Sequence, residues 1–431
     1  MKVIRHSDRN FRTGLAALLK GMHEIPPEVM KRASSIFDDV EKNGVEAVAK
    51  WTAKLDRNPV SGGRLRVTDA EMKKALAQVP GEDMEVIEFA AARIEAFHSL
   101  QVKGGFRYDD GAGTVIEERV TALDRAGICI PGGRAPLAST VLMTAIPAKL
   151  AGVSEIVMIS PWPGGSMNAH VLAAAKAAGV DAIFKIGGVQ GVAALALGAG
   201  KVPRCDKIVG PGSIWVTAGK SIAQSRGLCG IDSLAGPSEI LIIADENAPA
   251  RLVAIDLLSQ AEHGEDSNSI LVTVSKKLLS EVGKELKKLA NEFSNEAPAM
   301  SRAAEQVTAV LVKDMEQAIE VSNLVAPEHL EVMASSPKKI IKKLRHGASI
   351  FVGPYSPVPA GDYLAGGNHV LPTGGSARFS SPLSVEDFVK RQTITRLSKK
   401  ALKDISGAGR RLAEMEGLAA HSLSIKSRFK K

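Results

Sequence analysis

Residues 127–160 have the sequence GICIPGGRAPLASTVLMTAIPAKLAGVSEIVMIS, and this stretch decides the fold class. It begins with a short apolar run, turns at Pro131-Gly132-Gly133, passes through a helix-forming segment and ends in a second β-rich run. A strand, a glycine turn, a helix and another strand in that order indicate parallel strands joined by a crossover helix.

The same alternation continues on the C-terminal side of this stretch, with helical stretches between the β-rich runs. The first series of β-rich runs comprises 127–130, 155–160, 181–186 and 207–209. The second series comprises 239–244, 269–274, 308–312, 330–333 and 349–352. Apolar strands that alternate with helices predict parallel sheets covered on both faces, and therefore an α/β protein with two Rossmann-like (incomplete) domains.

The flanking segments differ from this pattern. Residues 1–25 predict a short helical lead-in that ends at Pro26, and residues 28–100 predict helices from apolar spacings of three to four. Residues 353–382 are rich in Gly, Pro and Ser and predict a long ordered loop, which in compact proteins is usually functional. The chain closes with a helical segment.

Composition narrows the functional class. Aromatic residues make up only 4% of the chain, which argues against base-stacking platforms for single-stranded nucleic acid. No apolar run is long enough to span a bilayer, and the first thirteen residues lack the apolar core of a signal peptide. Cys129, Cys205 and Cys229 show no CxxC spacing, which fits a reduced cytoplasm better than a disulfide framework or a thiolate zinc site.

The net charge of +8 is concentrated near the C-terminus. Residues 390–431 hold twelve Lys and Arg against three acidic residues, so they carry +9 while residues 1–389 carry −1. A basic tail can indicate nucleic-acid binding. We favour a solvated helical arm that lies on an acidic neighbour, because the charges alternate with helix formers and no nucleic-acid motif accompanies them.

Glycine turns follow several of the expected strands, where open α/β sheets bind their ligands. They are Pro131-Gly132-Gly133, Gly187-Gly188 and Gly210-Pro211-Gly212-Ser213. Such turns let backbone N–H groups approach a phosphate at a helix N-terminus. None matches GxGxxG with an acidic residue about twenty positions later, so each taken alone indicates a plain turn.

Two pairs of polar residues stand at the ends of expected helices. Gln260 and His263 share one face of the helix that starts after Asn247, which suits two ligands of one metal. A His in a last helical turn is more often there for the helix dipole. Glu328 and His329 follow the helix-breaking Pro327 and offer two proton acceptors on one loop. The alternative interpretation is that they are two exposed polar residues.

Further candidates lie in the Gly/Pro loop and near the chain end. Asp362 and His369 are candidate ligands or substrate anchors, and the alternative is Asx-turn capping. Glu416 and His421, taken alone, look like ordinary surface residues.

Together these segments resemble the signature segments of histidinol dehydrogenases, in that family's order. The segments are Ala235-Gly236-Pro237-Ser238-Glu239, Gln260-Ala261-Glu262-His263-Gly264, Ala326-Pro327-Glu328-His329-Leu330-Glu331, Gly361-Asp362-Tyr363 and Asn368 to Gly375. The resemblance covers nearly the whole chain. It implies the oxidation of L-histidinol to L-histidine in two NAD-dependent steps, through an aldehyde held on the enzyme.

The resemblance also implies roles for individual residues. One zinc ion per subunit would be bound by Gln260, His263, Asp362 and His421. Glu328 and His329 would be the acid–base pair. The residues implied to contact the substrate are Ser238, Gln260, His263, His329, Asp362, His369, Glu416 and His421. The family is a homodimer whose C-terminal arm completes the neighbour's site, which gives the basic arm a purpose.

The chain departs from the family at two cofactor contacts. Cys129 stands where the family usually has a Tyr before Pro-Gly-Gly, and Ser213 stands where it usually has an Asn after Gly-Pro-Gly, whereas Gln190 is kept. These changes are expected to alter the affinity of the chain for its cofactor. They leave open a paralogous zinc and NAD dehydrogenase of the same fold that acts on another small polar alcohol. A third reading, a basic nucleic-acid or scaffold protein without catalysis, is opposed by the intact candidate ligands.

The expected organisation follows. We expect an N-terminal helical segment at 1–25, a discontinuous first α/β domain at 26–128 and 236–382, a second α/β domain at 129–235, and a helical C-terminal arm at 383–431. The expected partners are L-histidinol, NAD, zinc and a second copy of the chain, with no nucleic acid and no membrane, in the cytoplasm.

Overall fold

The computed structural model describes residues 1–19, 25–58, 64–132, 136–165, 168–260, 267–294 and 299–429. The chain divides into two units. The first comprises Met1–Gln101 and Asp124–Phe388, and the second comprises Val102–Leu123 and Val389–Lys431.

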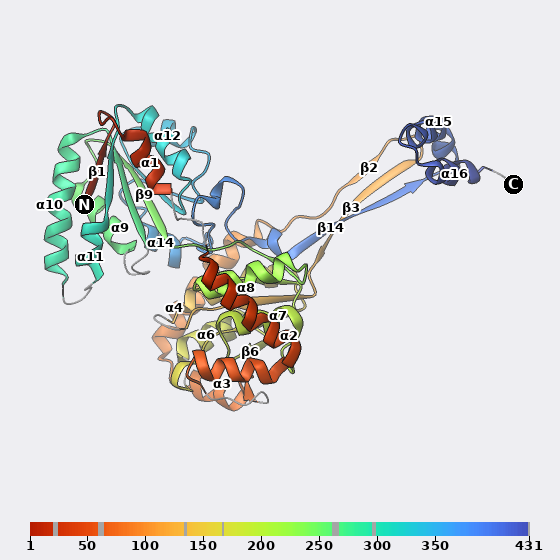
Figure 1. Cartoon of the computed structure of the whole chain (residues 1–431), viewed down its shortest axis with the longest axis horizontal. Helices are drawn as coiled ribbons and strands as arrows, with labels where there is room; N and C mark the ends of the chain where they lie inside the picture. The colour runs from red at the N-terminus through yellow and green to blue at the C-terminus, as the bar shows by residue number, and fades with distance from the viewer. Residues whose placement is uncertain are drawn as a thin grey trace. The chain divides into compact units, whose positions relative to one another are not determined.

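The first unit contains a six-stranded parallel sheet with the strand order β1-β11-β10-β9-β12-β13 (Figure 1). Its strands are β1 (Lys2–Arg5), β9 (Glu239–Ala244), β10 (Asn268–Thr273), β11 (Thr308–Leu311), β12 (His329–Met333) and β13 (Ser349–Val352). The central strand β9 has the sequence EILIIA and is buried along its whole length, as expected of a parallel strand covered on both faces.

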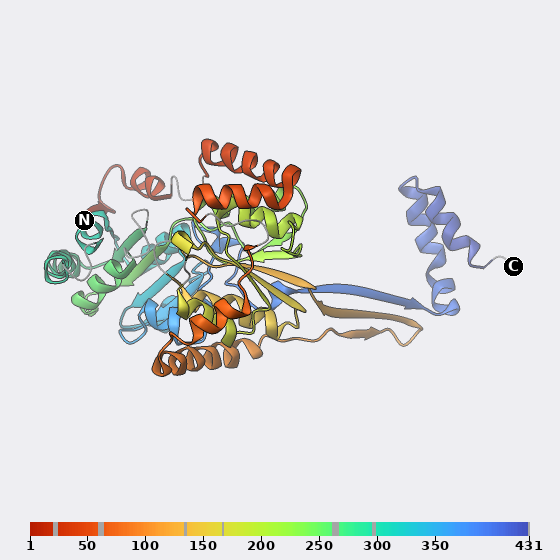
Figure 2. The ribbon, with the colours of Figure 1, turned by 90° about the horizontal axis from the view of Figure 1, so that it is seen from below.

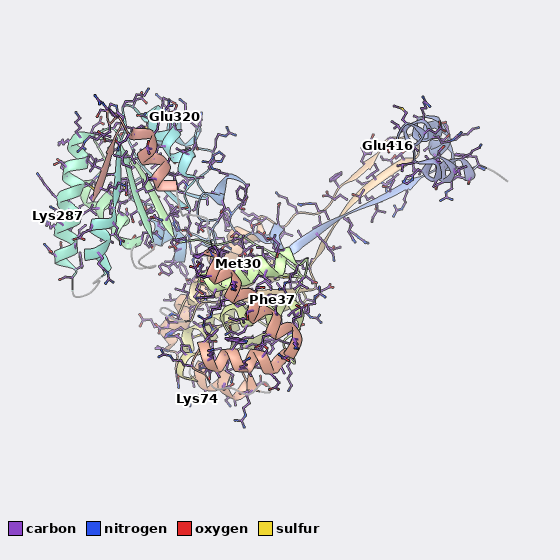
Figure 3. The ribbon with its side chains drawn as sticks, viewed as in Figure 1. Met30, Phe37, Lys74, Lys287, Glu320 and Glu416 are labelled. Carbon is purple, nitrogen blue, oxygen red and sulfur yellow. The ribbon has the colours of Figure 1, made fainter. Side chains whose placement is uncertain are left out.

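Alternate side chains of β9 belong to two different cores, because successive strand residues point to opposite faces. Ile240 and Ile242 pack with helices α9 (Ala250–Ser259), α10 (Lys276–Glu292) and α11 (Ala299–Gln306). Leu241 and Ile243 pack with α1 (Phe11–Leu19), α12 (Met315–Val325) and α13 (Pro337–Ile341). The helices turn charged side chains outward, as Lys287 and Glu320 illustrate in Figure 3.

The first unit also contains a five-stranded parallel sheet with the order β6-β5-β4-β7-β8. Its strands are β4 (Arg125–Cys129), β5 (Glu155–Ile159), β6 (Ala182–Phe184), β7 (Lys207–Val209) and β8 (Gly230–Ile231). One face packs against α2 (Pro27–Leu55), α7 (Gly188–Leu197) and α8 (Ile214–Ser225), with the α2 side chain Phe37 fully buried. The other face packs against α3 (Asp69–Leu76), α4 (Gly81–Ser99), α5 (Ala138–Leu150) and α6 (Ala169–Ala177).

In each parallel sheet, with β1 set aside, the strands that follow the first one along the chain are added on one side of it, and the later strands are added on its other side. The reversal falls between β4 and β7 in the five-stranded sheet, and between β9 and β12 in the six-stranded sheet. Ligands of open α/β sheets bind beyond the carboxyl ends of the strands at such a switch point. The predicted α/β class with two parallel sheets is confirmed.

The second unit is an antiparallel sheet with two helices. Its strands β2 (Arg107–Asp109), β3 (Thr114–Ala122) and β14 (Val389–Leu397) have the order β14-β3-β2. Helices α15 (Lys399–Met415) and α16 (Ala419–Ser427) follow, and Figure 2 shows them together at one end of the strands. No described helix of the chain is long and apolar enough to cross a membrane.

Several sequence predictions were wrong at the level of elements. Residues 2–5 form strand β1, which pairs with β11, although we predicted a helical lead-in. The arm predicted as helical from 383 begins with the 3-10 turn Val385–Phe388 and then β14. The pairing of β14 with β3 escaped prediction because its partner lies far away in the chain and its exposed face is charged.

The remaining differences concern packing and the Gly/Pro loop. Helices α2 and α4 pack against helices of the five-stranded sheet, whereas we had grouped 26–128 with 236–382. Amphipathic spacing shows that a helix has a buried face but does not identify the sheet that it covers. The stretch 353–382, predicted as a loop, contains helix α14 (Val358–Tyr363) and the 3-10 turn Ser376–Arg378.

Candidate functional site

The predicted acid–base pair lies at the start of β12. Helix α12 ends at Ala326, whose φ of 52° is in the left-handed region, and Pro327 prevents the helix from continuing. Glu328 therefore precedes the strand and His329 begins it. We expected the chemically important residues after strands, but this pair stands at the amino end of the six-stranded sheet, next to the first residues of β9.

Hydrogen bonding fixes the orientation of both side chains. The imidazole Nδ1 of His329 lies 3.0 Å from the backbone oxygen of Glu239. The Glu328 carboxylate accepts a hydrogen bond of 3.0 Å from the backbone N–H of Glu239. The two side chains approach to 3.6 Å between His329 Nδ1 and Glu328 Oε2, and both are buried. Glu328 and His329 therefore lie close together at one loop-to-strand junction.

The structure brings Asp362 to the same place. Asp362 lies on α14, and its Oδ1 is 3.8 Å from His329 Nε2. Burial raises the pKa of Asp362 to about 7. The Asp362 carboxyl group is therefore poorly solvated, with the His329 imidazole as an ionisable neighbour. A carboxylate in such a position can serve as a ligand for a cation.

Three carboxyl groups share this environment. Burial raises the pKa of Glu328 well above its ordinary value, and the nearby Glu239 and Asp362 carboxylates raise it further. Burial also raises the pKa of Glu239 to about 7. Like charges in a region of low dielectric disfavour one another's ionisation. A cation beside Asp362 would relieve that repulsion and lower the pKa of Glu328.

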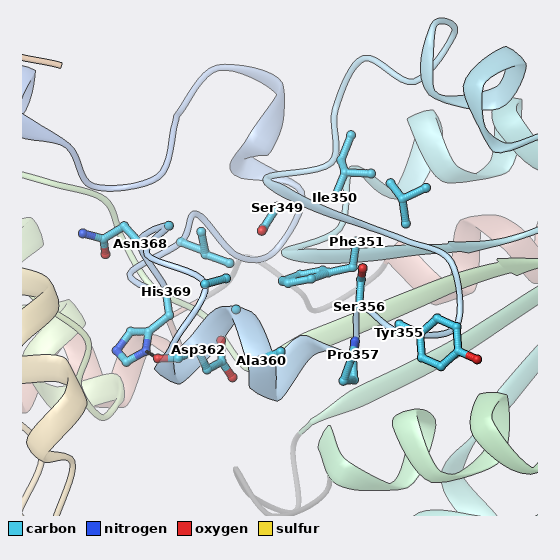
Figure 4. A pocket seen from close by; sticks show the side chains of 15 residues that line it. Ser349, Ile350, Phe351, Tyr355, Ser356, Pro357, Ala360, Asp362, Asn368 and His369 are labelled. Atoms are coloured by element: carbon cyan, nitrogen blue, oxygen red, sulfur yellow. Dashed lines mark hydrogen bonds between the residues drawn. The ribbon is translucent and has the colours of Figure 1, made fainter. Parts of the chain in front are cut away.

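His369 is fixed beside Asp362 by two contacts. Its Nδ1 lies 2.8 Å from the backbone oxygen of Asp362, and its Nε2 lies 3.1 Å from the Thr140 hydroxyl. A carbonyl oxygen can only accept, so Nδ1 carries the proton. His369 and Asp362 lie together in a cavity of about 450 Å³ that Phe351 and Tyr355 also line (Figure 4). Two residues predicted from a Gly/Pro loop therefore meet at one cavity.

Gln260 provides a test of whether the residues fit a metal. It caps the C-terminus of α9, is 2% exposed, and its Nε2 has no hydrogen-bond partner among the described residues. A buried amide N–H without a partner is costly, whereas the oxygen of the same amide group can bind a metal ion. Oxygen ligands from Gln260 and Asp362 fit zinc, which accepts N and O donors.

The sequence predicts two further ligands, His263 and His421. His263 lies outside the described residues, and His421 belongs to α16 in the second unit. Among the residues that the structure describes, no three His, Cys, Asp or Glu side chains come together as a metal site. Glu416 also belongs to the second unit, and both Glu416 and His421 are exposed there. Ser238 directly precedes β9 and is partly exposed, and its carbonyl accepts a hydrogen bond of 3.0 Å from the Asn268 N–H.

The three predicted cofactor contacts line one second cavity. Cys129 ends β4, Gln190 lies in the first turn of α7, and Ser213 is the N-cap of α8. All three line a cavity of about 1000 Å³ together with the glycine turns after β6 and β7. The cavity lies at the carboxyl ends of the strands, beside the switch point between β4 and β7, where an open α/β sheet binds its ligand.

Sequence reasoning missed a carboxylate in this second cavity. Asp56 accepts hydrogen bonds of 3.3 Å from the Gly187 N–H and 3.4 Å from the Gln190 amide. Burial raises the pKa of Asp56 to about 6. Its position after a long amphipathic helix gave no functional signal. The missed Glu239 had a signal, because it ends the segment Ala235-Gly236-Pro237-Ser238-Glu239.

Comparisons with known proteins all point to one family. The family model described as histidinol dehydrogenase matches residues 21–429. A histidinol dehydrogenase of Geobacter metallireducens is 43% identical over 432 residues, which cover 100% of this chain and 98% of the relative. A histidinol dehydrogenase of Acinetobacter baylyi is 43% identical and is covered completely, as is this chain. The crystal structure of a histidinol dehydrogenase from Elizabethkingia anophelis superposes with a TM-score of 0.92 at 34% identity, covering 99% of this chain and 98% of that one.

Proposed function

The chain belongs to the histidinol dehydrogenase family of oxidoreductases, and from that premise we propose that it oxidises L-histidinol to L-histidine in two NAD-dependent steps through L-histidinaldehyde. This reaction would be the last step of histidine biosynthesis. The observation that carries the proposal is the cluster of the buried His329 and Glu328 with the partly buried Asp362, in which a base, a carboxyl group and a candidate metal ligand meet.

His329 would accept the alcohol proton in the first oxidation. Its Nδ1 proton is directed to the Glu239 carbonyl, which leaves Nε2 as the basic nitrogen of the neutral ring. As the carbinol carbon transfers a hydride to the nicotinamide, the hydroxyl proton would pass to Nε2. A group that accepts a proton at neutral pH usually accelerates such a step by about a hundredfold or more.

Glu328 would act in the second oxidation. The aldehyde must add water before a second hydride can leave, and a carboxylate can remove a proton from that water. The raised pKa of Glu328 makes it a stronger base than an ordinary glutamate once it is ionised. The Glu239 N–H holds one of its oxygens in place, so the other oxygen is available for the water.

One zinc ion would be held by Gln260, His263 and Asp362, with His421 supplied by a second copy of the chain. Bound there, the ion would orient the imidazole and amine of histidinol and favour the neutral amine. The buried position of Gln260 at the end of α9 and the raised pKa of the partly buried Asp362 carboxyl group support this assignment. Ser238, His369 and Glu416 would complete the contacts with the substrate.

The cofactor would bind in the cavity lined by Cys129, Gln190 and Ser213. Glycine turns at Gly187-Gly188 and Gly210-Pro211-Gly212 border this cavity, and they let a dinucleotide approach the backbone closely. A small thiol and a small hydroxyl at two of the three contacts leave room that a larger side chain would fill.

The test is to measure NADH formation with L-histidinol and a panel of other small polar alcohols, with and without a zinc chelator. We expect turnover with L-histidinol, loss of turnover on chelation, and recovery on addition of zinc. Preference for another alcohol would replace the substrate but keep the reaction class. Full activity in a metal-free preparation would remove zinc from the proposal.

A further inference from the structure

Two carboxyl groups, Asp256 and Glu331, meet in the core of the six-stranded sheet, and the reaction proposed above uses neither. Glu331 is 1% exposed in the middle of β12, and Asp256 is 9% exposed on α9. Glu331 Oε2 has no hydrogen-bond partner among the described residues, and the Asp256 carboxyl group is its neighbour. Because Glu331 is in register with Ile242 of β9, it points to the sheet face that α9 covers.

A hydrogen bond between these two groups requires a shared proton, because two ionised carboxylates can only accept. Burial raises the pKa of Glu331, and the neighbouring Asp256 carboxylate raises it further. Burial likewise raises the pKa of Asp256. The other oxygen of Glu331 accepts a hydrogen bond of 3.2 Å from the backbone N–H of Val358, the first residue of α14.

The pair connects the three elements that carry the candidate site. Each element supplies one residue to the candidate site. Each also supplies a second residue, two positions away on the strand or one turn away on a helix, to a layer behind the site. The residues of the site are His329 on β12, Gln260 at the end of α9 and Asp362 on α14. The residues of the layer behind are Glu331, Asp256 and Val358.

From this geometry we propose that Asp256 and Glu331 share one proton and act as positioning residues that hold α9, β12 and α14 in register, so that Gln260 and Asp362 present their oxygens to one metal ion. The metal part of this inference rests on the proposed function. The proton-sharing part rests on the two buried carboxyl groups alone.

The experiment uses the full chain and compares two substitutions at one position. Glu331→Gln keeps an oxygen for the Val358 N–H and offers an amide N–H to the Asp256 carboxylate. Glu331→Met has a similar length but can make neither bond. Zinc affinity is measured by competition with a chromophoric chelator, without any assay of activity. We expect Glu331→Met to bind zinc about 10- to 100-fold more weakly, the usual effect of losing an outer-shell partner, and Glu331→Gln to stay close to the wild type.

A matched control separates positioning from general loss of stability. Leu286 on α10 is buried on the same face of the sheet, and Leu286→Ala destabilises the core without touching the pair. Its zinc affinity should equal that of the wild type. If Leu286→Ala weakens zinc binding as much as Glu331→Met does, or if Glu331→Gln fails to preserve the affinity, the positioning role is overturned.

Infrared difference spectra at neutral pH test the shared proton without any metal. The wild type should show the carbonyl band of a protonated carboxyl group, shifted in D₂O, and both Asp256→Asn and Glu331→Gln should remove it. If neither substitution removes such a band, the shared proton is overturned. If the wild type shows the band but binds no zinc, the proposed metal site and the positioning toward it both fall, while proton sharing is upheld.

Discussion

The Nδ1 atom of His329 lies 3.0 Å from the backbone oxygen of Glu239, and this contact determines which nitrogen of the ring is basic. A carbonyl oxygen has no proton to give, so Nδ1 carries the proton and Nε2 is turned toward Asp362. The contact also ties the first residue of β12 to the first residue of β9, across the switch point of the sheet. The base is thus oriented by a backbone carbonyl group.

His329→Gln should therefore slow the first oxidation by about a hundredfold or more, because no group of suitable pKa remains to take the alcohol proton. The amide can still donate to the Glu239 carbonyl, so the fold should be kept. The measurement is single-turnover NADH formation from L-histidinol, with circular dichroism as the control for folding. A loss of less than about threefold would show that the proton leaves by another route.

Glu328→Gln should mainly slow the oxidation of the aldehyde, by a similar factor of about a hundred, because the water loses its base. The amide oxygen can still accept from the Glu239 N–H, so the local backbone should stay in place. Supplying L-histidinaldehyde directly and comparing its turnover with that of L-histidinol separates the two half-reactions. Equal and mild effects on both would mean that the two roles are wrongly assigned.

Cys129→Tyr should strengthen NAD binding. Cys129 lines the cavity of about 1000 Å³ at the end of β4, and an aromatic ring there could stack on the cofactor. Titration by the fluorescence of Trp215, which lines the same cavity, gives the dissociation constant directly. Cys129→Ala serves as the control and should leave the affinity nearly unchanged. Unchanged or weaker binding by the Tyr variant would show that the cofactor is held differently here.

Asp56 predicts a pH dependence of stability. Burial raises its pKa from 3.8 to about 6, so the folded chain holds this proton more tightly than the unfolded chain. Between about pH 4 and pH 6 the folded state carries the extra proton, and the free energy of unfolding therefore falls as the pH rises through that window. Above about pH 6 the free-energy cost of keeping the ionised Asp56 carboxylate buried no longer changes with pH.

Asp56→Asn removes that cost and should raise the free energy of unfolding by roughly 1–2 kcal/mol at pH 8, but little near pH 4. Urea denaturation at the two pH values measures the difference. Asp404→Asn, at an exposed position of α15, is the control and should change neither value. A wild type whose stability is flat from pH 4 to pH 6 relative to Asp56→Asn would contradict the prediction.

The parallel strands and the candidate residues could be predicted from sequence because their signals are local. The apolar run 239–244 indicates a strand, and Pro327 before Glu328 and His329 indicates the end of a helix. Each of these signals lies within a few residues. The missed features depend on partners distant in the chain. In the sequence, Glu331 is one acidic residue within a strand, and only the packed structure shows Asp256 of α9 as its neighbour. The role of β3 likewise depends on its pairing with β14. Local patterns identify elements, whereas contacts between elements follow only from the packed structure.

The C-terminal helices require a second copy of the chain under the proposed function. Glu416 and His421 are exposed in the second unit, and α15 also exposes Ile405, Leu412 and Met415. Apolar side chains on a helix that carries strong positive charge are typical of a surface that another molecule covers. We therefore expect activity to depend on a homodimer in which each arm delivers His421 to the partner's Gln260 and His263.

Complementation tests this exchange. His421→Ala chains and His263→Ala chains should each be inactive, yet a mixed dimer should regain part of the activity. One of its sites receives both defects, while the other combines an intact Gln260/His263 segment with an intact arm. The two variants are co-expressed with different tags, the mixed dimer is purified, and NADH formation is measured.

The matched control mixes His263→Ala with Gln260→Ala, whose defects lie on the same segment. Each site of that mixed dimer keeps one damaged segment, so no activity should return even though both arms are intact. Recovery in the first mixture and none in the second would place His421 in the partner's site. If the first mixture is no more active than its parents, the arm serves its own subunit, and the basic charge of residues 390–431 needs another explanation.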